Sequence, residues 1–189
     1  MLRQSASYMQ FHMDSPQYKK LQDAVEFVRQ SFADKGINLD YTPESVKHLD
    51  KLFDDEVRNG NPRNPDSGFA KFQGVIMAGT TGYLTEVVLR HTHNGQLDID
   101  PNDEHWYLNF KVVAENTWTI QPGQRVLKRM QQGNEAEFYA YILSAIKYFS
   151  QPKADATEEH PNEGYTYTQE VYVRDETKEE KKKPWWKLW

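Results

Sequence analysis

A short run of histidine and aspartate residues is the best candidate for metal chemistry in this sequence. His91 and His93 stand at alternate positions, and Asp98 follows a few residues later. Alternate residues of a β-strand share one face, so these side chains could bind zinc or another divalent cation in a metal-dependent hydrolase. The run matches no established ligand spacing, and a calcium loop counted from Asp98 would place Asp103 where the loop needs glycine. We therefore expect no metal and no cofactor, and His91, His93 and Asp98 are the ligands of the hydrolase alternative.

Glu86 is the best candidate for an acid–base residue. It follows Tyr83 by three positions and precedes Arg90 by four, so a helix would place it beside both side chains. One interpretation is a catalytic base; the other, which we favour, is an ion pair with Arg90 at the edge of the core. A second acidic group, residues 54–56, is predicted to lie on the solvent-facing side of its helix, because unpaired charges are seldom buried.

The C-terminal end of the chain combines aromatic and basic residues in an unusual way. Three tryptophans and a leucine fall within the last five residues, after a run of lysines. Tryptophan anchors many protein interfaces and also suits the membrane–water boundary, while lysine is attracted to anionic headgroups. We expect a docking peptide that binds another protein, formed by Trp185, Trp186, Leu188, Trp189, Lys182 and Lys183. Packing on the chain's own domain and contact with a membrane surface remain alternatives.

Two amphipathic helices are predicted near the N-terminus. The first begins at Ser15, a favourable N-cap followed by proline, and ends near Gly36. The second begins at residues 42–44 and ends at Asn59-Gly60. Each helix carries apolar residues every three or four positions, so both are expected to pack one face on the core.

A longer helix is predicted over residues 69–90. It contains a row of small side chains every four positions, namely Ala70, Gly74, Ala78 and Gly82. Such a row lets another backbone approach closely, which explains glycines that otherwise cost about 1 kcal/mol each in a helix. We therefore take this helix as the central and most buried one, with a break expected near Thr80. A strand that starts at Leu84 is the alternative.

The pattern changes to short strands beyond the long helix. Aromatic and β-branched residues at 105–113 and 117–120 predict an antiparallel hairpin that turns at residues 115–116. Further helices are predicted over residues 121–133 and 135–149. The elements together predict an α+β fold in which helices pack on a small antiparallel sheet.

The 189 residues are expected to form one globular domain with an extension at each end. Residues 1–14 are assigned to an N-terminal extension, residues 15–150 to the α+β domain, and residues 151–189 to a flexible, charged linker and tail. Within this tail, residues 165–173 alternate in the manner of a late strand.

Composition excludes several classes of function. The chain has no cysteine, so it has neither disulfides nor a thiol nucleophile. Its net charge of -5 argues against a nucleic-acid partner. No stretch approaches the roughly 20 apolar residues of a membrane span, and the N-terminus lacks the apolar segment of a secretory signal. We therefore expect a cytoplasmic protein.

Several motifs follow one another in the middle of the chain. They are residues 39–45, Tyr83-Leu84-Thr85-Glu86-Val87, Trp106, Gln121-Pro122, and the basic stretch 125–130 with Gly133. This order resembles a diffuse group of uncharacterised bacterial α+β domains over residues 37–149, although Thr85 stands where that group usually has glycine. Some members resemble immunity-type proteins encoded beside toxins. The resemblance implies an α+β fold and transfers no catalytic residue.

These observations predict a non-enzymatic bacterial protein-binding or adaptor module that docks through its C-terminal peptide. An immunity-type inhibitor would be one form of it. The alternatives are a metal-dependent hydrolase that uses His91, His93 and Asp98, and a peripheral membrane protein attached through the tail.

Overall fold

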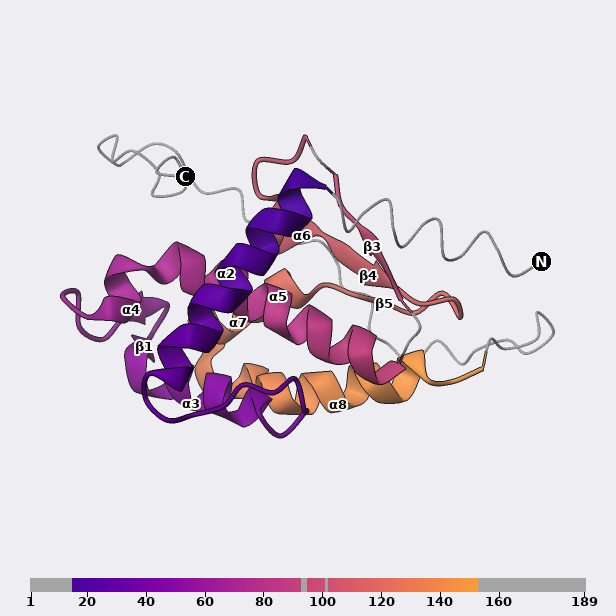
Figure 1. Cartoon of the computed structure of the whole chain (residues 1–189). Coiled ribbons are helices and arrows are strands. Elements are labelled where there is room, and N and C mark those ends of the chain that lie inside the picture. Colours follow the sequence, from indigo (N-terminus) through magenta and orange to yellow (C-terminus); the bar gives the residue numbers. More distant parts are fainter. Residues whose placement is uncertain (1–14, 93–94, 101, 153–189) are drawn as a thin grey trace. The chain divides into compact units, whose positions relative to one another are not determined.

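Helix α5 lies at the centre of the fold and packs against α2, α7 and α8 in the computed structural model of the chain (Figure 1). The structure describes residues 15–92, 95–100 and 102–152. Within these ranges the helices are α2 (Pro16–Ala33), α3 (Val46–Glu56), α4 (Gly68–Lys71), α5 (Gln73–Thr92), α6 (Trp106–Asn109), α7 (Pro122–Gln132) and α8 (Phe138–Phe149), with a 3-10 turn at Gly133–Ala136. The strands are β1 (Val57–Arg58), β2 (Asn61–Pro62), β3 (Gln96–Asp98), β4 (Lys111–Val113) and β5 (Thr119–Ile120).

The predicted α+β class is confirmed, since helices pack with small antiparallel sheets. The first and the last two predicted helices correspond to α2, α7 and α8. The assigned extension at residues 1–14 lies outside the described residues. The same holds for residues 153–189, which include the candidate late strand at 165–173.

Helices α2 and α5 approach each other closely because two glycines of α5 face α2. A Cβ atom at Gly79 would clash with the carbonyl oxygen of Ala24. A Cβ atom at Gly82 would lie 2.5 Å from Cγ2 of Val25, closer than two such carbons can come. The predicted row of small residues is therefore correct at Gly82, but it misses Gly79.

Helix α5 continues through Thr80 without the expected break, and no strand begins at Leu84. Two of its buried threonines find a hydrogen-bond partner within the helix itself. Thr81 and Thr85 each donate a hydroxyl hydrogen bond to the carbonyl oxygen four residues earlier, at 2.9 Å. These bonds satisfy hydroxyls that would otherwise be buried without a partner. The interruption lies instead at Phe72, between α4 and α5.

Three short strands form an antiparallel sheet in the order β3–β4–β5, with Leu97 paired to Val112. The predicted hairpin is present, but its first strand is shorter than expected, because residues 106–109 form the helical turn α6. The carboxylate of Asp103 organises this turn and accepts a hydrogen bond from the side chain of Asn109 at 2.8 Å. Such local bonds compete with strand pairing.

The Asn59-Gly60 pair, predicted to stop the second helix, instead forms the turn of a two-stranded hairpin. Helix α3 ends at Glu56, and β1 pairs with β2 so that Arg58 lies opposite Asn61. Both turn residues have left-handed φ values, 49° and 79°, which tight hairpin turns require and Asn-Gly supplies readily.

We expect Gly79→Ala to destabilise the protein by about 1–3 kcal/mol, because overpacking at the α2–α5 contact outweighs the better helix propensity of alanine. Urea unfolding followed by circular dichroism measures the loss. Gly68→Ala is the matched control, since Gly68 is also helical but has open space around it. Equal stability of the two variants would contradict the close contact.

Candidate functional site

Two of the three predicted metal ligands, His91 and Asp98, lie in the part of the chain that the structure describes. His91 lies in the last turn of α5 rather than on a strand, and its Nε2 is 3.1 Å from the carbonyl oxygen of Tyr41. Asp98 is exposed on β3, and His93 falls outside the described residues. Across the described ranges, no three histidine, cysteine, aspartate or glutamate side chains are grouped as a metal site requires. The hydrolase alternative stays a prediction.

The predicted docking peptide lies outside the part of the chain that the structure describes. Its residues are Trp185, Trp186, Leu188, Trp189, Lys182 and Lys183. Their binding to another protein therefore stays a prediction, as does contact with a membrane surface. Of the helices in residues 15–92, 95–100 and 102–152, none combines the length and apolar character needed to cross a bilayer.

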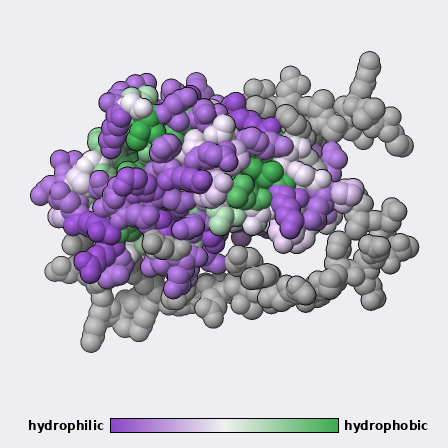
Figure 2. All heavy atoms as spheres, turned by 90° about the horizontal axis from the view of Figure 1, so that it is seen from below, coloured by the Kyte–Doolittle hydropathy of each residue, from purple (hydrophilic) through white to green (hydrophobic). Residues whose placement is uncertain are grey.

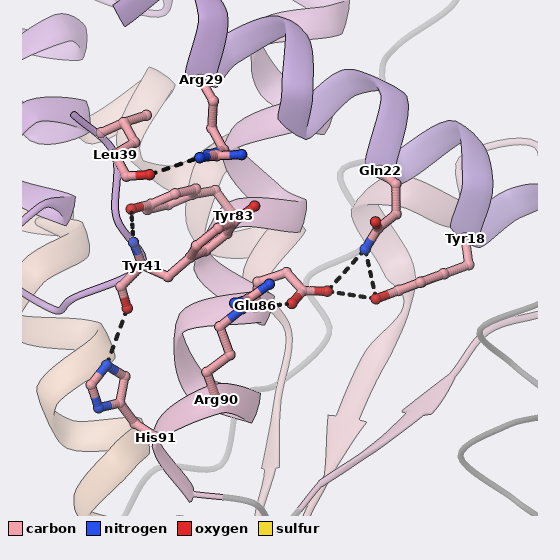
Figure 3. A network of polar contacts seen from close by, with 9 residues as sticks. All are labelled: Tyr18, Gln22, Arg29, Leu39, Tyr41, Tyr83, Glu86, Arg90 and His91. Atoms are coloured by element: carbon pink, nitrogen blue, oxygen red, sulfur yellow. Dashed lines mark hydrogen bonds and ion pairs between the residues drawn. The ribbon is translucent and has the colours of Figure 1, made fainter. Parts of the chain in front are cut away.

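A network of polar contacts joins α2, α5 and the loop between α2 and α3 (Figure 3). We call it the Tyr41 cluster. Its members are Tyr18, Gln22 and Arg29 of α2, Leu39 and Tyr41 of the loop, and Tyr83, Glu86, Arg90 and His91 of α5. Three elements meet here, so the cluster is the first place to look for acid–base chemistry.

Glu86 is fully engaged within this cluster. Its carboxylate accepts a hydrogen bond of 2.5 Å from the Tyr18 hydroxyl and one of 3.1 Å from Gln22 Nε2. The predicted ion pair with Arg90 is confirmed at 3.1 Å, and the Glu86 side chain is only 12% exposed. Burial and the neighbouring carboxylate raise the pKa of Tyr18 well above its usual value. These contacts fit a structural ion pair better than a catalytic base.

Tyr41 has an unusual backbone that the cluster holds in place. Its φ of 64° is left-handed, which is costly for a bulky side chain. Its N–H donates to the Tyr83 hydroxyl at 2.8 Å, and its carbonyl accepts the Nε2–H of His91. Its ring stacks on Tyr83 with centroids 4.9 Å apart, and the Arg90 guanidinium lies 3.9 Å from the ring centre. The cluster thus fixes the loop on α5.

A buried arginine links α3 to α7 and α8. Arg129 is 1% exposed, and its Nη2 donates to Asp54 Oδ1 at 2.7 Å and to the Asp50 carbonyl at 3.2 Å. The Asp50 carboxylate accepts the N–H groups of Phe138 and Tyr139, at 2.8 and 2.9 Å, at the start of α8. Burial raises the pKa of Asp50 despite these bonds.

The prediction that residues 54–56 face solvent fits Asp54, whose side chain is 44% exposed although it also pairs with buried Arg129. It fits Asp55 as well, which forms a surface pair with Lys51 at 3.0 Å. The missed partner, Arg129, stands among the apolar residues of α7, and an arginine on that face was the available signal.

Trp118 and Tyr148 form an exposed aromatic stack, here called the aromatic pair. Their ring centroids are 4.4 Å apart and their planes differ by 22°, with 41% and 37% of the residues exposed. Asn116 clamps the turn that carries Trp118 to the end of α8, because its Nδ2 donates to the carbonyls of Tyr148 and Gln151 at 2.8 and 2.9 Å. Thr117 between them has a left-handed φ of 73°. These two hydrogen bonds tie the turn that presents Trp118 at the surface to the end of α8.

The chain matches no protein-family model, no curated protein and no solved structure. The resemblance to bacterial α+β domains stays a prediction.

We expect the stability of the fold to decrease as the pH rises above about 10, the ordinary pKa of tyrosine. Between that pH and the raised pKa of native Tyr18, the unfolded chain has lost a proton that the native state keeps, so unfolding becomes easier. Urea unfolding at several pH values should show a shallower decrease for Tyr18→Phe. Below pH 10 this variant should be less stable by about 1–2 kcal/mol, because Glu86 loses a donor. A pH dependence unchanged in Tyr18→Phe would contradict the assignment.

A second prediction compares two ion pairs of α3. We expect Arg129→Met to cost about 3–5 kcal/mol, because it leaves Asp50 partly buried beside no cation. Lys51→Met removes an exposed pair on the same helix and should cost less than about 1 kcal/mol. Chemical unfolding of both variants measures the difference. Similar losses in the free energy of unfolding would show that the Arg129 pairs stabilise the fold no more than the exposed pair does.

Proposed function

We propose that this chain is a non-enzymatic protein-binding module that contacts its partner through the aromatic pair. The single observation that carries the proposal is the exposed stack of Trp118 on Tyr148. Tryptophan and tyrosine are the residue types that most often dominate the binding energy of protein interfaces.

The aromatic pair is already ordered for binding. Side chains that are mobile before association lose rotamer freedom when they bind, which costs about 0.5–1.5 kcal/mol each. Here Asn116 fixes the turn and the stacking fixes both rings, so most of this cost is met during folding. A partner that covers the rings gains their burial with little further ordering.

Other exposed apolar residues fit this role less well. Phe27 and Phe72 also touch, but their rings are tilted by 54° with centroids 5.4 Å apart, so they do not stack. Leu143 is exposed with no aromatic partner in the described contacts. The face in Figure 2 is mostly hydrophilic with small, separate hydrophobic areas. Recognition by a few anchor residues suits such a surface better than a broad apolar contact.

An interaction role also agrees with the interior of the described fold. Glu86, the best acid–base candidate, has each oxygen engaged by a neighbouring donor. Two depressions in the described ranges hold about 200 and 110 Å³. Small-molecule sites usually exceed about 300 Å³. The docking peptide predicted at Trp185, Trp186 and Trp189 would add a second contact to the same kind of partner.

Affinity capture with the full chain as bait, followed by quantitative mass spectrometry, tests the proposal. A lysate of the organism that encodes the chain supplies the partner. Trp118→Ala should reduce the captured partner at least about tenfold, because hot-spot residues contribute roughly 2 kcal/mol or more. Phe27→Ala is the matched control, since it removes an equally exposed aromatic residue from α2.

A partner retained equally by wild type, Trp118→Ala and Phe27→Ala would contradict the role of the aromatic pair. A third variant, with alanine at Trp185, Trp186 and Trp189, separates the two contacts. Loss of the same partner in this variant means that the tail takes part in binding, whereas full retention means that the aromatic pair acts without it.

A further inference from the structure

A depression of about 200 Å³ lies where the end of α3, the β1–β2 hairpin and the end of α7 meet. Hydrogen-bond donors dominate its lining, and they come from Arg58, Asn59, Arg63, Arg129, Gln131 and Gln132. Asp54 is the acidic residue among the lining side chains. Three guanidinium groups thus face one carboxylate, which is an unusual excess in a chain with a net charge of -5.

The three arginines differ in how far their hydrogen-bonding capacity is used. Arg129 is buried and engaged by Asp50 and Asp54, so it forms the floor of the depression. Arg63 donates from Nε to the Val57 carbonyl at 3.2 Å, which positions its side chain along β1 and leaves its two terminal nitrogens for another acceptor. Among the described residues, Arg58 is exposed and makes no side-chain hydrogen bond or ion pair.

We propose that this depression binds a phosphate group through Arg58 and Arg63. Arginine presents two parallel donors that match the oxygen spacing of phosphate, and pairs of this kind are among the strongest hydrogen bonds in proteins. The positions of both arginines are set by the hairpin, whose Asn59-Gly60 turn and β1–β2 pairing hold the strands together. The proposal concerns a site separate from the aromatic pair.

The number of donors favours phosphate over carboxylate. Each of the two guanidinium groups can present a parallel pair of donors, whereas a carboxylate has one pair of oxygens to accept such a pair. A phosphate group has three or four oxygens arranged tetrahedrally, so it can accept from both guanidinium groups at once.

The local charge balance permits an anion. Asp50 and Asp54 together carry one negative charge more than Arg129 neutralises, and the C-terminal ends of α3 and α7 each add about half a negative charge. Arg58 and Arg63 contribute two positive charges at the mouth, so the local charge sums to about zero. Binding is therefore expected to depend on direct hydrogen bonds and not on long-range attraction.

Calorimetric titration of the full chain with inorganic phosphate tests the site, in a chloride buffer at constant ionic strength. Arg58→Gln removes a side chain with no described contacts, so its fold should be unaffected, and Arg58→Gln combined with Arg63→Gln removes both donors. Each should weaken phosphate binding by about tenfold or more, the order expected when charge-assisted hydrogen bonds are lost. The control is Lys19→Gln combined with Lys20→Gln, which removes the same charge from α2, an element that does not line the depression.

Retained binding in the lysine control and loss in the arginine variants would support the site. Equal weakening in all variants would overturn it, because binding would then follow net charge alone. Absence of phosphate binding, or acetate binding as tightly as phosphate, would overturn it as well. Phosphoserine and adenosine monophosphate carry the same phosphate group on an amino acid and on a nucleoside. The one that binds more tightly than inorganic phosphate identifies which of these two classes of ligand supplies the phosphate.

Discussion

The close contact between α2 and α5 is the constraint on which the rest of the structure depends. Without a side chain at Gly79 and Gly82, the two helices approach until the α5 backbone meets Ala24 and Val25. Helix α5 is consequently buried on almost every side, which is why its sequence is apolar or small rather than amphipathic. The dispersion energy of such a contact decreases steeply with the distance between the helices. Each glycine therefore contributes more to stability than its own small buried area indicates.

The Tyr41 cluster is a consequence of this approach. Tyr18 and Gln22 can reach Glu86 because α2 lies so near α5 that side chains from both helices share one carboxylate. Glu86 in turn orients Arg90, whose guanidinium covers the ring of Tyr41. The polar contacts thus fix the loop after α2 at a position that the packing of the helices has already made available, and they satisfy groups that would be costly to bury alone.

The sequence predicted features that depend on local periodicity and missed those that depend on distant partners. Apolar spacing located the helices, and the spacing of Glu86 and Arg90 predicted their ion pair. The predicted end of α3 was wrong because an Asn-Gly pair can stop a helix or form a hairpin turn. Only the pairing of β1 with β2 decides between these two roles for Asn59-Gly60. Arg129 was missed because its carboxylate partners lie on α3, far away in the chain. The aromatic pair joins a turn to a helix end, so no periodicity reveals it.

Two non-glycine residues with left-handed backbones hold a loop and a turn of the fold in place. Tyr41 and Thr117 both have left-handed φ values, 64° and 73°, although neither is glycine. The strain at Tyr41 is held by contacts with Tyr83 and His91, which tie a loop to the central helix. The strain at Thr117 is held by Asn116, which clamps the turn to the end of α8 and leaves the neighbouring Trp118 exposed. The left-handed backbone at this turn therefore fixes the chain between β4 and β5 against the end of α8 and places Trp118 at the surface.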